Sequence, residues 1–137
     1  MKVILTAMIL LACAVTAAQA QVAVIVNKSV GVSALTTSEL QDIYTLSTKE
    51  WKSGGKITVF DLKVDAVKDK FYAHLGKSSA DLRKAWMRVQ LSGEGKAPEV
   101  LGSDDEVVER VGATAGAIGF VTADMVKGSV KVVATIP

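Results

Sequence analysis

The chain has 137 residues, of which 50% are hydrophobic, and a formal net charge of +2 at pH 7. This length suits one domain with a single hydrophobic core. Basic and acidic side chains are interspersed and nearly balanced, which argues against a nucleic-acid-binding protein, because such a protein presents a basic face to the phosphate backbone.

The first twenty residues have the pattern of an export signal. Lys2 supplies the positive start, Val3 to Val15 is almost wholly apolar, and Ala18-Gln-Ala20 has the form of a cleavage site. The apolar run is shorter than the ~20 residues that span a bilayer. We therefore predict a signal peptide over residues 1–20 and an exported domain over residues 21–137.

Cys13 gives an alternative interpretation of this segment. Leu10-Leu-Ala-Cys13 looks like a lipoprotein box, but it comes early and the apolar run continues beyond it. A lipid anchor is therefore the less favoured prediction. Cleavage after Ala20 would remove the only cysteine, so the exported domain would fold without disulfides.

The first half of the domain alternates strand and helix signals. Val22 to Val26 is a continuous apolar run, typical of a strand buried on both faces. Thr36-Thr-Ser-Glu39 has the spacing of a capping box and predicts a short helix through Tyr44. Ser53-Gly-Gly55 then predicts a turn into a strand over Lys56 to Phe60.

Two helices are expected next. Asp65 can cap a helix with Val67, Phe71 and Leu75 on one face, and Gly76 ends it. Ser78 or Ser79 begins another helix. Its inward residues are expected to be Leu82, Ala85, Trp86 and Val89.

The last third of the chain contains a glycine-punctuated apolar stretch, Ala113 to Val121. Pro98 to Leu101 predicts a short edge strand, and Ser103-Asp-Asp-Glu106 predicts a second capped helix. Gly116 and Gly119 then indicate a turn or a close backbone approach within a buried strand. A final strand is expected over Val130 to Thr135. Strands alternating with helices predict an α/β fold with a mixed, mostly parallel sheet flanked by helices.

The residue patterns of enzymes do not occur. His74 is the only histidine, no G-x-S-x-G motif is present, and no spacing suits a metal. Ser92-Gly-Glu-Gly-Lys96 fails as a phosphate loop because Ala97 follows the lysine. Asp61 and Asp65 are expected to be solvated and to cap rather than to form a catalytic pair. We predict no catalysis, no metal and no cofactor.

One kind of binding chemistry remains. The N-terminus of a helix offers unpaired backbone N–H groups and a partial positive charge, which suit a small anion. The helix that opens near Asp65 has Lys63 and Lys68 beside it, while Asp61 and Asp65 oppose an anion by like-charge repulsion.

The order of several short motifs resembles the phosphate-binding proteins of bacterial ABC transporters, and most of all short PstS-like members. The resemblance covers nearly the whole of residues 21–137. It is carried by Val22 to Asn27, Leu35-Thr-Thr-x-Glu-Leu40, Ile43-Tyr44, Trp51-Lys-x-Gly54, Ile57, Phe71, Trp86, Ser92-Gly-x-Gly95, Pro98 and Gly116-Ala-Ile-Gly-Phe120.

This resemblance implies a fold of the periplasmic binding protein type 2, with one lobe of a clamshell that closes around an oxyanion. It implies phosphate or another small oxyanion as ligand, and transporter membrane components or a second copy of the chain as partners. The family's Arg and Ser-Gly-Thr, however, are replaced here by Asp61-Leu-Lys-Val-Asp-Ala66. The expected ligand-binding residues are Lys63, Asp65, Ala66, Val67 and Lys68. The alternative is a ligand-free lobe that acts as a protein-interaction module.

Overall fold

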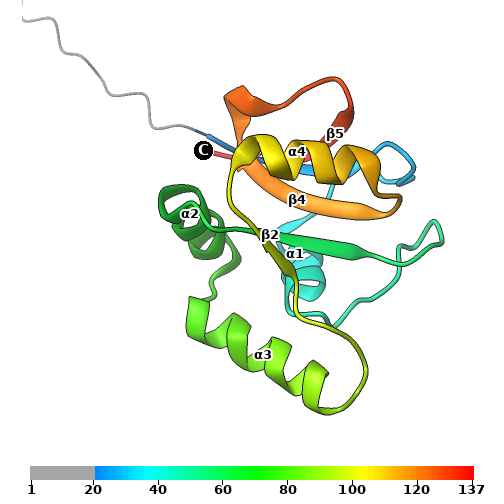
Figure 1. Cartoon of the computed structure of the whole chain (residues 1–137), viewed down its shortest axis with the longest axis vertical. Helices are drawn as coiled ribbons and strands as arrows, with labels where there is room; N and C mark the ends of the chain where they lie inside the picture. Colours follow the sequence, from blue (N-terminus) through cyan, green and yellow to red (C-terminus); the bar gives the residue numbers. More distant parts are fainter. Residues whose placement is uncertain (1–20) are drawn as a thin grey trace, which may run out of the picture.

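Five strands form one sheet in the order β3-β2-β4-β1-β5 (Figure 1). The computed structural model describes residues 21–137, so the predicted signal peptide and Cys13 lie outside the described residues. The strands are β1 (Val22–Asn27), β2 (Thr58–Leu62), β3 (Glu99–Leu101), β4 (Ala117–Thr122) and β5 (Val130–Ile136). The helices are α1 (Thr37–Tyr44), α2 (Asp65–Leu75), α3 (Ser79–Leu91) and α4 (Asp104–Ala113), with a 3₁₀ turn η1 (Ala123–Met125).

The sheet is mixed, and β1 is the strand that runs against its neighbours. β2 pairs in parallel with β3 and β4, whereas β1 pairs antiparallel with both β4 and β5. All six residues of β1 are buried, as its apolar run predicts. The expected α/β class with a mixed sheet flanked by helices is confirmed.

Helices cover both faces of the sheet (Figure 1). On one face α4 approaches β4 so closely that a Cβ at Gly119 would lie 2.6 Å from Val107 Cγ1. On the other face Phe71 of α2 stacks on Phe120 of β4, with ring centroids 4.1 Å apart. Tyr44 at the end of α1 meets Phe71 edge-on at 4.7 Å. These contacts form the centre of the hydrophobic core.

Helix α3 lies farthest from the sheet (Figure 1). It is anchored by Leu82, which is fully buried, and by Trp86, whose Nε1 donates to the Tyr44 carbonyl at 2.7 Å. The predicted inward positions Ala85 and Val89 are only half-buried.

The glycine turn before β4 joins three separate segments. Gly116 adopts φ +75°, and its carbonyl accepts from the backbone N–H of Thr58 at 3.2 Å and from Trp51 Nε1 at 2.9 Å. This geometry confirms the prediction that the glycines serve a turn and close backbone approaches.

Two helix starts differ from the predicted ones. Val64, not Asp65, is the N-cap of α2, and it supplies no side-chain hydrogen bond. At α4, Ser103 accepts from the Glu106 N–H as expected. The Glu106 carboxylate accepts instead from the Gly102 N–H at 3.1 Å, so the reciprocal half of the capping box does not form.

No helix within residues 21–137 has both the length and the apolar character needed to cross a bilayer.

Candidate functional site

The carboxyl ends of β2 and β3 lie together at one edge of the sheet, where α2 begins. The two strands are parallel, and the backbone N–H of Lys63 donates to the Leu101 carbonyl at 2.9 Å just beyond their last pair. Ligands of open α/β sheets bind outside the carboxyl ends of the strands, which makes this edge the candidate site.

Helix α2 differs from the other described helices at its first turn. The N-termini of α1, α3 and α4 are capped by the hydroxyls of Thr36, Ser78 and Ser103. At α2 the N-cap residue is Val64, whose apolar side chain cannot accept a hydrogen bond from the first N–H groups of the helix. The amides of residues 65–67 therefore retain donor capacity, since the first turn of a helix has no intrahelical acceptors.

The predicted site residues are brought together around this turn. Lys63, Asp65 and Ala66 are exposed, Lys68 is half-buried, and the side chain of Val67 is buried in the core. Val67 could therefore serve a ligand only through its backbone N–H.

Lys68 and Asp65 form a loose ion pair one helical turn apart. Lys68 Nζ lies 3.8 Å from Asp65 Oδ1, and the Asp65 side chain is 85% exposed. An exposed pair at this distance is weak. The carboxylate of Asp65 also interacts favourably with the positive end of the helix dipole, so it competes with any anion for the same turn.

Asp61 was predicted to be solvated in the loop before α2, and this prediction is wrong. The strand extends to Leu62, and Asp61 is buried on the α2 side of the sheet. Tyr72 Oη donates to Asp61 at 2.8 Å, and the Leu62 N–H donates to the same carboxylate at 3.0 Å. These partners explain how a carboxylate is accommodated in the core.

Burial raises the pKa of Asp61 above its ordinary value of 3.8, and the hydrogen bonds from Tyr72 and Leu62 offset this only in part. Burial, followed by the charge of Asp61, raises the pKa of Tyr72. Tyr72 was not singled out by the sequence. Its position next to Phe71 on a predicted amphipathic helix was only a weak indication that its hydroxyl would be buried and would bind a polar group.

Comparison with solved structures identifies the architecture. The chain superposes on a phosphate ABC transporter substrate-binding protein with bound phosphate from Clostridium perfringens with a TM-score of 0.68 and 23% identity, over 83% of this chain and 45% of that one. It superposes on an ABC-type phosphate transport receptor from Vibrio cholerae with a TM-score of 0.66 and 22% identity, over 84% of this chain and 46% of the receptor. The chain has a PstS-like fold. PstS from Borrelia burgdorferi matches with a TM-score of 0.60 and 17% identity, over 84% of this chain and 47% of that one.

Comparisons with models of protein families and with curated proteins find no match. The chain spans less than half the length of each of these structural neighbours. At these identities the likeness establishes the fold of this chain.

The second helix start at the same edge of the PstS-like fold is dominated by acids. The first turn of α4 carries Asp104, Asp105 and Glu106, and Ser103 caps it. These carboxylates oppose an anion there, which leaves α2 as the better-suited terminus. Within residues 21–137 no group of three or more His, Cys, Asp or Glu side chains is arranged to hold a metal ion.

Proposed function

We propose that this protein is a periplasmic solute-binding protein of the PstS-like type that binds a small oxyanion such as phosphate without catalysis. The anion would be bound by the backbone N–H groups of Asp65, Ala66 and Val67, with the ammonium groups of Lys63 and Lys68 beside them. Its partners would be the membrane components of an ABC transporter or a second copy of the chain.

The observation that carries this proposal is the uncapped start of α2 at the carboxyl end of β2. Backbone N–H groups at a helix N-terminus point toward a ligand, and the helix dipole favours a negative charge there. The similarity of this fold to that of the Clostridium perfringens protein, whose structure contains bound phosphate, also supports the proposal. A single helix terminus offers few donors, so the affinity is expected to be modest unless further donors close over the anion.

A thermal melt in phosphate, sulfate or chloride at matched ionic strength tests the proposal. Phosphate is expected to raise the melting temperature with increasing concentration, because a ligand that binds only the folded state stabilises it by mass action. Sulfate is expected to act more weakly and chloride not at all. Equal curves in all three salts would count against anion binding.

Two substitutions should move the phosphate response in opposite directions. Asp65→Asn removes the competing carboxylate while keeping its shape, and it is expected to tighten phosphate binding about fivefold. Lys63→Ala removes a nearby cation and is expected to weaken binding by about the same factor. Each variant is compared with its own melt without phosphate, since Asp65→Asn also removes a favourable contact with the helix dipole.

Lys77→Ala is the matched control, because Lys77 is exposed and follows the opposite end of α2. Its phosphate response should equal that of the unmodified protein. A similar loss in Lys63→Ala and Lys77→Ala would indicate general attraction by net charge, not a site at the helix start.

The alternative function is a ligand-free lobe that recognises another protein. It is favoured by Asp65, whose charge opposes an anion at the start of α2, and by Val64, which is 37% exposed there. This alternative predicts no specific response to phosphate even in Asp65→Asn. The two functions are therefore separated by that one variant.

A further inference from the structure

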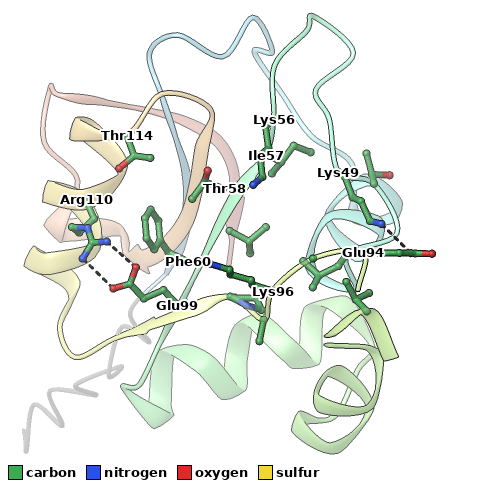
Figure 2. Close-up of a pocket in the computed structure, with 17 residues that line it drawn as sticks. Lys49, Lys56, Ile57, Thr58, Phe60, Glu94, Lys96, Glu99, Arg110 and Thr114 are labelled. Atoms are coloured by element: carbon green, nitrogen blue, oxygen red, sulfur yellow. Dashed lines mark hydrogen bonds and ion pairs between the residues drawn. The ribbon is translucent and has the colours of Figure 1, made fainter. Parts of the chain in front are cut away.

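A pocket of about 460 Å³ lies at the other end of β2, away from the start of α2 (Figure 2). It is formed by the loop after α1, the segment that leads into β2 and its first half, the C-terminal end of α3, the loop before β3, and Arg110 and Thr114 at the C-terminal end of α4. None of the residues proposed to bind an oxyanion lines it. Its volume is within the range of about 300–1,000 Å³ typical of small-molecule sites.

The pocket opens where the edge of the sheet is incomplete. β4 pairs with Thr58 and Val59 of β2, while the pairing with β3 covers Phe60 to Leu62. Before the start of β3, the loop from Glu94 to Pro98 lies beside the unpaired edge of β2 and forms one wall of the pocket. The pocket therefore reaches side chains from both faces of β2, with Phe60 on the α4 side and Val59 on the other.

Two ion pairs fix opposite ends of the pocket (Figure 2). At one end Arg110 donates to both oxygens of Glu99, at 3.2 and 2.7 Å, and its guanidinium lies 5.2 Å from the Phe60 ring centroid. At the other end Lys49 Nζ lies 3.0 Å from Glu94. A bidentate ion pair whose guanidinium also contacts an aromatic ring has a well-defined geometry, so these side chains form an ordered wall of the pocket.

Two further cations line the pocket, Lys56 and Lys96. Unlike Lys49 and Arg110, neither forms an ion pair with a residue in the part of the chain that the structure describes. Because both acids of the lining are already paired, the pocket carries an excess of two positive charges. It is therefore suited to a negatively charged ligand.

The floor between these charges is apolar. Val59, Phe60 and Pro98 are buried, and Leu46, Val89 and Ala97 are half-buried around them. Inorganic phosphate would leave this floor without a partner, and a neutral apolar molecule would leave the two ammonium groups without one. An apolar floor with a few charged groups at its margin is the usual composition of a site for a small organic molecule.

We propose that this pocket binds a small organic anion, with an apolar body on Val59, Pro98 and Val89 and an acidic group neutralised by Lys56 and Lys96. This site is independent of the oxyanion site at α2. It gives the lobe a second ligand of a different chemical class.

The probe for this site is 8-anilinonaphthalene-1-sulfonate, an aromatic sulfonate that fluoresces when it leaves water. Titration of the purified protein is expected to give a saturable rise in fluorescence. Lys56→Gln combined with Lys96→Gln is expected to weaken the apparent affinity about fivefold, because two charge-assisted contacts are lost at a partly exposed site. Hexanoate is expected to displace the probe, and inorganic phosphate at equal ionic strength is not.

The matched control combines Lys28→Gln with Lys52→Gln, two exposed lysines that do not line the pocket. It lowers the net charge equally and should leave the affinity within about twofold. Ala97→Trp fills the pocket and should abolish the signal where circular dichroism shows that the variant is folded. Equal affinities in the two double-lysine variants, or displacement by phosphate alone, would overturn the proposal even if Ala97→Trp fails to fold.

Discussion

Replacing Gly116 by alanine is expected to destabilise the protein by about 3 kcal/mol or more. Gly116 has φ +75°, a conformation that costs a residue with a Cβ about 1 kcal/mol. The added Cβ would also clash with the carbonyl oxygen of Lys56, which is backbone and cannot move aside as a flexible side chain can. Urea unfolding monitored by tryptophan fluorescence measures the change.

Gly76→Ala is the matched control for this prediction. Gly76 ends α2 with φ +68°, nearly the same backbone conformation, but no atom lies within 4 Å of an added Cβ. It should therefore cost only about 1 kcal/mol, the penalty of the left-handed conformation alone. Equal losses in the two variants would show that the turn before β4 relaxes and that the close approach of Lys56 is not a constraint.

The Gly116 turn also shows which parts of the fold can be predicted from sequence. Gly116, the capping box at Thr36 and the continuous apolar run of β1 are local signals, and the structure confirms each of them. The direction of β1 is not local. An apolar run buried on both faces indicates a central strand but not whether its neighbours are parallel, and here both are antiparallel.

The surroundings of the candidate site differ from the prediction at Asp61, whose burial depends on tertiary contacts. Asp61 follows an apolar strand and precedes a helix, which is the ordinary pattern of a loop residue. It is instead part of β2 and is buried, and it accepts a hydrogen bond from Tyr72, the residue after Phe71 of the expected apolar stripe. The predicted N-cap of α2 was one residue too late, because Asp65 is a better capping residue than Val64 by local preference. In the structure Val64 is the N-cap and no side chain caps the helix.

The second pocket could not have been predicted from any local motif. Its lining comes from segments that are separated in sequence and meet only because β3 is too short to pair with the first half of β2. The stretch Ser92-Gly-Glu-Gly-Lys96 lacks the phosphate-loop motif, and only the structure shows that Glu94 and Lys96 line a pocket (Figure 2).

Replacing Tyr72 by phenylalanine is expected to destabilise the protein by about 2–3 kcal/mol at pH 7. The substitution removes the hydroxyl that donates to Asp61 and leaves a buried carboxylate with fewer partners. Tyr44→Phe is the control, because the Tyr44 hydroxyl is also buried but donates at 3.1 Å to the neutral carbonyl of Phe60. Tyr44→Phe should lower the free energy of unfolding by only about 1 kcal/mol.

The pH dependence of unfolding separates these two variants further. Because burial raises the pKa of Asp61 in the folded protein above 3.8, the folded state holds this proton more tightly than the unfolded state. The contribution of Asp61 to stability is therefore complete below about pH 3.8 and is lost as the pH rises through the raised pKa. Tyr72→Phe should raise that pKa further, since its hydrogen bond lowers it, so the variant should recover more stability on acidification than the unmodified protein. Tyr44→Phe should follow the same pH profile as the unmodified protein, and a parallel profile for Tyr72→Phe would mean that Asp61 is already protonated at pH 7.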